Sequence, residues 1–257
     1  MNCYDWPQYW DLAFDDDTQL EADFIEAAAR KYCSFPVRRL LEPGCGGGRL
    51  VLELAQRGYD VSACDLSDAA VEFARARLVA ANLTTANVVV DDMRELSCEP
   101  EADVAYCLVN TFRHLLTEDD AARHLRAVAD SVRSGGLYLI GMHLLPPDAD
   151  EEDSEEWSVS KGETTVNMRL DVAQCDRKTR METLKFRMEV VTSDADSPLC
   201  FETDYQMRIY RAHQFEELLK RVPEFELLDV YDFWYDIEEP LQLSDEMGDT
   251  VFVLRRL

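Results

Sequence analysis

Leu40-Leu41-Glu42-Pro43-Gly44-Cys45-Gly46-Gly47-Gly48-Arg49-Leu50 decides how this chain folds, because four of its ten glycines fall within five of these residues. The apolar pair Leu40-Leu41 precedes the glycines, and a helical pattern of apolar residues begins at Leu50. This order is typical of a strand, a tight turn and the start of a helix. Such a turn lets the backbone approach a ligand closely and presents the N–H groups of a helix N-terminus to it. The stretch therefore predicts a site for a nucleotide-like cofactor.

The spacing of the glycines excludes two familiar cofactor loops. A dinucleotide loop has the pattern G-x-G-x-x-G/A. Counted from Gly44, the third small position is Arg49, and counted from Gly46 it is Val51. The stretch also lacks the G-K-[ST] of a triphosphate loop. The chain has instead an acid followed by glycine at every second position, Glu42-x-Gly44-x-Gly46-x-Gly48.

Three later segments have strand character and end in polar residues. Tyr59–Asp65 ends in a carboxylate about 20 residues beyond the turn, where a carboxylate is placed to accept ribose hydroxyls. Asn87–Met93 ends in two acids and a methionine, and Asp103–Asn110 ends in an asparagine. Ligands of parallel sheets lie beyond the carboxyl ends of the strands, so these residues are predicted to surround one site.

In this order and spacing, the four segments resemble motif I and the strands that follow it in class I S-adenosylmethionine (SAM)-dependent methyltransferases, over residues 37–145. The resemblance implies a methyltransferase whose cofactor is SAM and whose product is S-adenosylhomocysteine. It implies that the glycine turn holds the methionyl part of SAM, Asp65 the ribose hydroxyls, and Asp92 the adenine amino group, with Asp91 as the alternative. The cofactor-binding residues assigned in this way are Glu42, Gly44, Cys45, Gly46, Gly48, Asp65, Leu66, Asp91, Asp92, Met93, Val109, Asn110, Tyr9 and Trp10.

Apolar strands that alternate with helices predict an α/β fold with a doubly wound, seven-stranded, mostly parallel sheet, the Rossmann-like methyltransferase fold. We expect one methyltransferase domain over residues 1–257. A helix over 118–133 is predicted to end at Ser134-Gly135-Gly136, a glycine cap. After the fifth strand, residues 148–210 are predicted to form an inserted antiparallel β subdomain, which begins with an exposed acidic loop over 148–156. This insertion is similar to that of sugar-amine N-methyltransferases, where it covers the acceptor pocket or forms a dimer face.

Residues 1–36 are predicted to be a helical segment that folds over SAM and the acceptor as a lid, again by the resemblance. Tyr9 and Trp10 are the candidate lid residues. The alternative for either aromatic side chain is simple packing of an amphipathic helix on the sheet.

The charge of the chain limits the partners that it can bind. Lys and Arg number 26 against 52 Asp and Glu, a net charge of −26. Proteins that bind nucleic acid usually carry a basic patch, so nucleic acid is disfavoured as the methyl acceptor. A small neutral or cationic acceptor suits this charge, and so does the alternative that the acids serve solubility or a salty habitat.

Other features of the composition predict a cytoplasmic protein. No apolar run approaches the roughly 20 residues that span a bilayer. The N-terminus has no signal-peptide pattern. The eight cysteines form no C-x-x-C pair, so neither a metal site nor a disulfide framework is predicted. The partners expected are a small-molecule acceptor and, through the insertion, a second copy of the chain as a homodimer, with no nucleic acid and no membrane.

His143 is the candidate catalytic base, because it follows the fifth strand and its reference pKa suits proton transfer near neutral pH. A structural role for His143 is the alternative. Asn110 is a candidate for contact with SAM or acceptor, with a helix N-cap as the alternative. The loop Phe233–Glu239 offers aromatic rings and acids for a cationic acceptor, or it is an ordinary loop.

The function predicted is transfer of a methyl group from SAM to nitrogen or oxygen of a small molecule. Methylation of a peptide or protein is a second possibility, and a SAM-binding scaffold without catalysis is a third.

Overall fold

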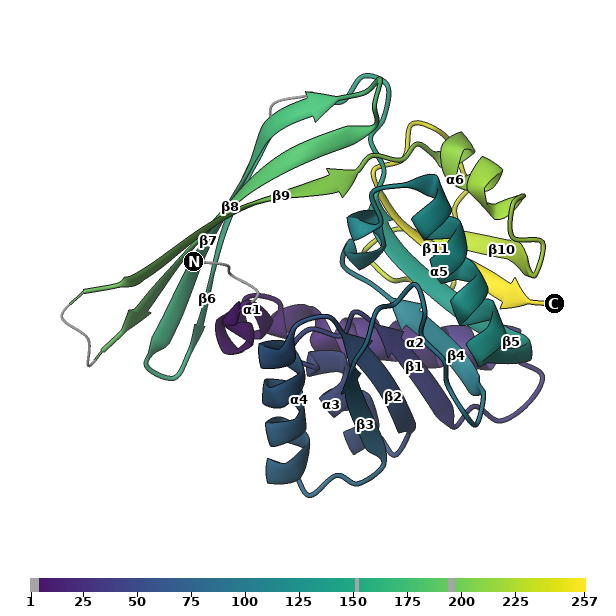
Figure 1. Cartoon of the computed structure of the whole chain (residues 1–257), viewed down its shortest axis with the longest axis horizontal. Helices are drawn as coiled ribbons and strands as arrows, with labels where there is room; N and C mark the ends of the chain where they lie inside the picture. Colours follow the sequence, from purple (N-terminus) through teal and green to yellow (C-terminus); the bar gives the residue numbers. More distant parts are fainter. Residues whose placement is uncertain (1–4, 151–152, 194–196) are drawn as a thin grey trace.

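A seven-stranded sheet forms the centre of the protein, in the strand order β10-β11-β5-β4-β1-β2-β3 (Figure 1). The computed structural model describes residues 5–150, 153–193 and 197–257; residues 1–4 of the predicted lid segment and residues 151–152 and 194–196 of the predicted insertion lie outside this description. Strand β11 runs antiparallel to both of its neighbours, and the other pairs are parallel. The predicted doubly wound, mostly parallel sheet is therefore confirmed. The strands are β1 (Arg39–Pro43), β2 (Asp60–Asp65), β3 (Ala86–Val90), β4 (Ala102–Cys107), β5 (Val132–His143), β10 (Phe225–Tyr231) and β11 (Asp249–Arg256).

Helices cover both faces of this sheet, which explains why its central strands are apolar almost throughout. Successive side chains of a strand point to opposite faces. Leu40 therefore packs in one core with α2, α3 and α4, whereas Leu41 packs in the other with α5 and α6. In the described part of the chain, no helix is both long and apolar enough to cross a membrane. The helices are α1 (Pro7–Ala13), α2 (Thr18–Tyr32), α3 (Arg49–Gln56), α4 (Asp68–Ala80), α5 (Glu118–Ser131) and α6 (Ala212–Leu219), with short 3-10 helices η2 (Asp15–Asp17) and η3 (Thr111–His114).

The order of the strands reverses at β1, which pairs with β2 on one side and β4 on the other. The chain continues from β1 through β2 to β3, then returns to the opposite side of β1. Crossovers that diverge from one point leave a crevice beyond the carboxyl ends of the strands, where open α/β sheets bind ligands. The fold therefore places the ligand site beside the glycine turn.

The glycine cap predicted after residue 133 is wrong. Helix α5 ends at Ser131, and β5 begins at the next residue. The glycines belong to an irregular stretch of β5, between the pairs Ala102↔Val132 and Val104↔Leu137. A Cβ on Gly136 would lie 2.6 Å from the carbonyl oxygen of Asp103, so close approach of the two strands, and not helix capping, requires glycine here.

The insertion is an antiparallel sheet of four strands that extends away from the core (Figure 1). Its strands are β6 (Ser154–Lys161), β7 (Thr164–Asp176), β8 (Met181–Thr192) and β9 (Leu199–Arg208). They lie within the range 148–210 that the sequence predicts. The predicted exposed loop over 148–156 is wrong at its end, because residues from Ser154 pair with β7.

One face of the inserted sheet packs on the N-terminal segment. The rings of Trp6 and Tyr9 lie 5.2 and 6.2 Å from that of Phe201 in β9, and Trp10 lies 4.9 Å from Phe186 in β8. Alternate residues of β7 and β8 belong to this face, because successive side chains of a strand point to opposite faces. In β7 the series begins at Val166 and in β8 at Leu184, and the pairing of the two strands places both series on the same face. The other face carries the polar residues between them.

A buried ion pair fastens the insertion to the core. Arg113, in η3, pairs with Glu182 at the start of β8, and both side chains are less than one-tenth exposed. The Nε of Arg113 also donates to the carbonyl oxygen of Arg208, at 3.0 Å. Because both charges are removed from water, loss of one leaves the other without a partner in a place where its solvation is poor.

We expect Arg113→Met to lower the free energy of unfolding by about 3–5 kcal/mol, because it leaves the Glu182 carboxylate buried and unpaired. Glu182→Met is expected to do the same. The double variant removes both charges. Its free energy of unfolding, measured by urea denaturation, should fall by less than the sum of the losses in the two single variants. Strictly additive losses would show that the two side chains do not interact.

Candidate functional site

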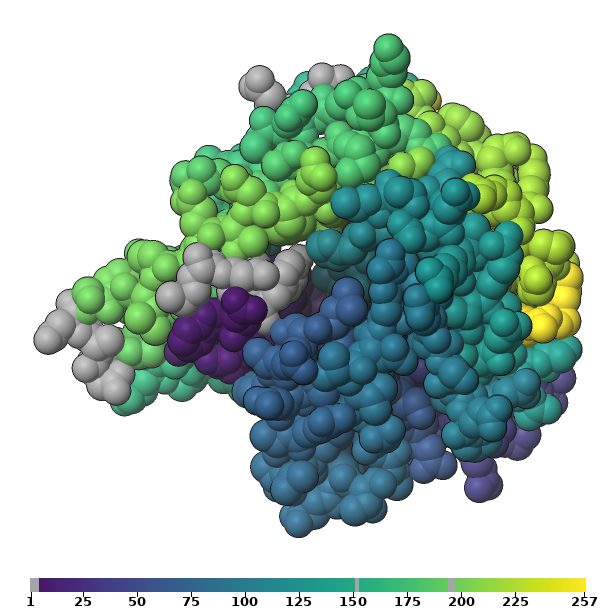
Figure 2. Space-filling model, viewed as in Figure 1, coloured from purple at the N-terminus to yellow at the C-terminus, as the bar shows by residue number. Residues whose placement is uncertain are grey.

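A cavity of about 1230 Å³ lies at the carboxyl ends of β1, β2, β4 and β5, between the core, the N-terminal segment and the inserted sheet. Figure 2 shows the face where these three parts of the chain meet. Pockets for one drug-sized ligand measure roughly 300–1,000 Å³. The cavity is therefore large enough for a cofactor and a second small molecule.

The glycine turn forms one wall of this cavity, and its backbone explains the need for glycine. Gly44 and Gly46 have positive φ angles of 69° and 53°. A Cβ on Gly44 would collide with the side chain of Thr111, whereas a Cβ on Gly46 would meet nothing within 4 Å. The turn is therefore packed against the protein at Gly44 and open to the cavity at Gly46. Cys45, between them, is buried.

Asp65 ties the tip of β2 to the glycine turn. Its Oδ2 accepts the N–H of Gly46 at 2.8 Å, and its Oδ1 accepts the N–H of Ser67 at 2.9 Å. An ionised carboxylate has about four acceptor positions, so each oxygen keeps one for a ligand. Leu66 lines the cavity beside it and is 68% exposed. Asp65 thus has a structural role that the sequence analysis did not find, in addition to capacity for two hydroxyl groups.

Of the two acids after β3, the structure places Asp91 on the cavity wall, together with Met93. Asp92 is not among the lining residues. Its carboxylate pairs with Arg94 at 2.5 Å, and this hydrogen bond lowers its pKa. The backbone N–H and the Nε of Arg94 also donate to Oδ1 of Asp92, so both oxygens of this carboxylate are bonded to Arg94. The structure therefore favours the alternative, Asp91, as the acid that faces the cavity.

Glu42 is buried at the end of β1 on the cavity wall. Its Oε2 accepts the hydroxyl of Tyr106 at 3.0 Å. Burial raises the pKa of Glu42 to about 8, so that the group is largely protonated at neutral pH. Nearby, Arg49 forms an ion pair with Glu21, in which Nη2 of the arginine lies 2.5 Å from Oε2 of the glutamate. A cation that entered the cavity beside Glu42 would favour its ionised form.

The two predicted lid aromatics have different environments. Trp10 lines the cavity. Tyr9 does not: its ring packs on Trp6 and Phe201. Successive residues of a helix are rotated by about 100°, and in α1 this turns Trp10 and Asp11 toward the cavity and Tyr9 toward the inserted sheet. For Tyr9, the structure therefore favours the alternative of simple packing over a place in the cofactor site.

Asp11, also in α1, reaches the glycine turn and was missed by the sequence analysis. A Cβ on Gly47 would lie 2.5 Å from its carboxylate. Asp11 also pairs with Arg77 of α4, and burial raises its pKa to about 6. No local pattern marks this aspartate, because its partners belong to α4 and the turn after β1.

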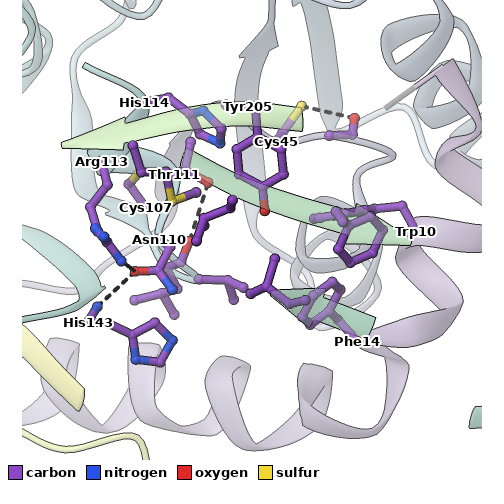
Figure 3. Close-up of a pocket in the computed structure, with 18 of the residues that line it drawn as sticks. Trp10, Phe14, Cys45, Cys107, Asn110, Thr111, Arg113, His114, His143 and Tyr205 are labelled. Carbon is purple, nitrogen blue, oxygen red and sulfur yellow. Dashed lines mark hydrogen bonds between the residues drawn. The ribbon is translucent and has the colours of Figure 1, made fainter. Parts of the chain in front are cut away.

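The turn after β4 brings Asn110 to His143. Val109 and Asn110 line the cavity with positive φ angles of 56° and 64°. Asn110 occupies the N-cap position of η3, but its side chain accepts no backbone N–H of that helix, so it does not cap the helix through its side chain. Its Oδ1 accepts a hydrogen bond from Nη1 of Arg113 at 3.4 Å. The same oxygen accepts the backbone N–H of His143 at 2.8 Å (Figure 3). The asparagine thus joins the ends of β4 and β5.

His143 lies on the cavity wall with an acidic partner. Its Nδ1 is 2.5 Å from Oδ1 of Asp249, at the start of β11, and this hydrogen bond lowers the pKa of Asp249. The ring of Phe233 lies 5.1 Å from the imidazole. Asp249 was missed because it lies 106 residues away along the chain. The loop Phe233–Glu239 contributes no residue to the cavity lining, and its Phe233 packs on His143 instead.

His114 also lines the cavity, beside Tyr205 of β9 (Figure 3). Burial lowers its pKa to about 4, so it is neutral at physiological pH. Among the described residues, no group of three or more His, Cys, Asp or Glu side chains is arranged to hold a metal ion.

The residues present fit an adenosyl sulfonium. The wall is open at Gly46, where the backbone would meet the ligand, and the carboxylate of Asp65 keeps acceptor positions for a diol. Met93 and Leu66 offer apolar surface to a ring, with Asp91 as an acceptor beside them. A diphosphate would find no lysine among the described lining residues.

A family model described as "Methyltransferase domain" matches residues 40–136. A ubiquinone biosynthesis O-methyltransferase from Alkalilimnicola ehrlichii is 35% identical over 104 residues, which are 40% of each chain. The chain spans about half the length of several curated relatives that it matches.

Solved structures share the fold over nearly the whole chain. A SAM-dependent methyltransferase from Clostridium acetobutylicum has a TM-score of 0.78 at 17% identity, covering 99% of both chains. An amino pentose methyltransferase from Micromonospora echinaspora, solved with SAM bound, has a TM-score of 0.69 at 20% identity, covering 95% of this chain and 92% of that chain. The resemblance that the sequence shows to SAM-dependent methyltransferases is therefore confirmed, in domain and in fold.

We expect Glu42→Gln to stabilise the protein at high pH. The folded state holds the Glu42 proton up to a pH of about 8, whereas the unfolded chain loses it near pH 4.5, so the wild-type protein loses stability as pH rises through this window. Glutamine keeps an acceptor for Tyr106 and does not ionise. Thermal unfolding should show a melting temperature several degrees higher for the variant at about pH 9, and no difference near pH 4.5.

Glu72→Gln, on the exposed surface of α4, is the control, and it should leave the pH profile of stability unchanged. A constant difference between Glu42→Gln and the wild-type protein at every pH would show that Glu42 does not hold its proton on folding.

Proposed function

We propose that this chain, which carries a methyltransferase domain in the class I fold, transfers a methyl group from SAM to nitrogen or oxygen of a small molecule. One observation carries the proposal: the glycine turn, ordered by Asp65, opens into a cavity that continues to the His143–Asp249 pair. A cofactor site and a proton acceptor thus share one space, as a group-transfer enzyme requires.

The residues around the glycine turn bind the cofactor in this proposal. The turn approaches the methionyl part, Asp65 accepts the ribose hydroxyls, Asp91 accepts from the adenine amino group, and Met93 packs on the ring. When bound, SAM supplies a methyl group on a sulfonium, so that an acceptor lone pair forms a bond to carbon as the carbon–sulfur bond breaks and its electron pair stays on sulfur. The protein's main contribution is then alignment of the two reactants.

His143 is the proposed base. The Asp249 carboxylate accepts a hydrogen bond from Nδ1, so the neutral ring carries its proton there and Nε2 is the acceptor. Asn110 fixes the backbone of His143, and Phe233 packs on the ring. These contacts restrict the imidazole to one tautomer and orientation, which favours proton transfer from an acceptor group.

The geometry favours this function over the two alternatives. The inserted sheet and the N-terminal segment roof the cavity, so an acceptor must fit between them, and this suits a small molecule better than a folded protein. The His143–Asp249 pair offers a proton acceptor on the cavity wall, which a scaffold that only binds SAM does not require.

The proposal includes a reducing, cytoplasmic environment, since the seven cysteines of the described residues are all free thiols. A homodimer through the inserted sheet stays a prediction. The overall test is calorimetry with SAM and S-adenosylhomocysteine, followed by transfer of labelled methyl from SAM to a library of small amines and phenols. Absence of cofactor binding would overturn the proposal.

Gly46→Ala should weaken SAM binding at least tenfold, because the added methyl group enters the space where the turn approaches the cofactor. Gly162→Ala is the matched control. Both glycines have positive φ angles, of 53° and 61°, and neither Cβ would meet an atom within 4 Å, so both variants carry a similar strain of about 1–2 kcal/mol. Gly162, in the turn between β6 and β7, lies outside the cavity. Calorimetry that finds equal SAM affinities for the two variants would remove the turn from the cofactor site.

His143→Phe should lower the turnover of the best library acceptor by about 10²–10⁴-fold while SAM affinity changes less than twofold, because only proton transfer is lost. Asp249→Asn should give a smaller loss, since the base remains but its tautomer is no longer set. Steady-state kinetics and calorimetry measure the two effects. A His143→Phe variant with normal turnover would leave the base role without support.

A further inference from the structure

The half of the cavity that the cofactor residues do not occupy has an apolar, aromatic wall. The inserted sheet contributes Leu170, Val172, Leu184, Phe186, Tyr205 and Met207, which share one face of β7, β8 and β9. This is the same face that packs on the N-terminal segment farther out. The cavity therefore ends in a surface that offers shape and apolar contact and few hydrogen bonds.

Aromatic side chains from separate elements complete this wall. The ring of Trp10 lies 4.9 Å from Phe186 and 5.2 Å from Phe14, and Phe14 lies 5.8 Å from Trp157 of β6. All four rings line the cavity, and Figure 3 labels Trp10, Phe14 and Tyr205 among the residues of its wall. Because these rings already pack on one another, the wall is formed without a ligand. Such a surface suits a flat or bulky apolar group.

The charges around the cavity are unfavourable for an anion. Among the described lining residues, the lysines and arginines are Arg49 and Arg113 alone. Both are buried and already paired, with Glu21 and Glu182. Asp150, Asp153 and Glu155 line the cavity near the start of β6. A phosphate or carboxylate on the acceptor would lose its hydration here without gaining a free cation, whereas an ammonium group would be attracted.

We propose that the methyl acceptor is an amine with an aromatic or bulky apolar body and with no phosphate or carboxylate group. This inference rests on the proposed function and specifies its acceptor. The apolar body packs between the inserted sheet and the N-terminal rings, and the nitrogen points toward His143. The acceptor arrives as an ammonium, attracted by the acids, and gives its proton to Nε2 of His143 before its lone pair is used.

The same charges argue against a phenol as the acceptor. A neutral phenol is not attracted by the surrounding carboxylates, and the phenolate that must form before transfer is repelled by them. The distinction is therefore testable with molecules that share a ring and differ in one group.

The test uses four commercial probes with SAM. Phenethylamine has the ring and the amine, 4-ethylphenol exchanges the amine for a phenol, phenylalanine adds a carboxylate, and glucosamine replaces the apolar body with a polar one. We expect kcat/KM for phenethylamine to exceed that for each of the other three at least tenfold, by transfer of labelled methyl with the product identified by mass spectrometry. Equal or faster methylation of any other probe, or no methylation of phenethylamine, would overturn the inference.

A pair of variants locates the selectivity on the inserted sheet. Leu170→Lys places a cation on the cavity face of β7, and it should raise KM for phenethylamine at least tenfold while the SAM dissociation constant changes less than twofold. Val191→Lys adds the same charge on the opposite, exposed face of β8, where Val191 is 41% exposed, and should leave both constants unchanged. Equal KM values for the two variants would overturn the inference.

If Leu170→Lys does not fold, Phe186→Leu provides the same test. It keeps an apolar side chain and removes the ring, so KM for phenethylamine should rise at least threefold at unchanged SAM affinity, and an unchanged KM would count against the inference. Calorimetry with SAM distinguishes failure of the acceptor proposal from failure of the proposed methyltransferase function. SAM binding together with selectivity for glucosamine would overturn the acceptor and leave the methyltransferase function standing, whereas absence of SAM binding would overturn both.

Discussion

The bonds from Gly46 and Ser67 to the carboxylate of Asp65 are the constraint on which the site depends. They join the turn after β1 to the tip of β2 and so hold the backbone open at Gly46. Without this anchor, a turn of four glycines would have many conformations of similar energy, because glycine has more backbone freedom than any other residue. One carboxylate thus orders the turn and still keeps acceptor positions that face the cavity.

The insertion and the N-terminal segment depend on one another. A single face of the inserted sheet packs on the rings of α1 at one end and roofs the cavity at the other. The buried Arg113–Glu182 pair fastens this sheet to the turn after β4, beside the residues that reach His143. The same elements therefore close the cavity and shape its apolar half, so the packing of the N-terminal segment and the shape of this half depend on one interface.

The sequence predicts which residues share the cavity where local pattern and strand direction are sufficient. Gly44, Gly46, Asp65 and Met93 all lie on the cavity wall, because the carboxyl ends of parallel strands meet at one edge. Asp92 and Tyr9 do not line the cavity, although each neighbours a residue that does. Which of two adjacent side chains points inward depends on the twist of the element and on the exact residue at which it ends. The sequence pattern does not fix either feature to within one residue.

By itself, the sequence determined the fold class and the edge of the sheet at which the glycine turn and the strand-end acids meet. These predictions use local features: the spacing of glycines, acids at strand ends, and the alternation of strands and helices. Each of these features depends on residues that are close together in the sequence. Only the tertiary structure decided which distant residues meet: His143 with Asp249 across 106 positions, Arg113 with Glu182 across 69, and the rings of α1 with the inserted sheet. These contacts arise from the packing of whole elements, so no short stretch of the chain contains the information that would reveal them.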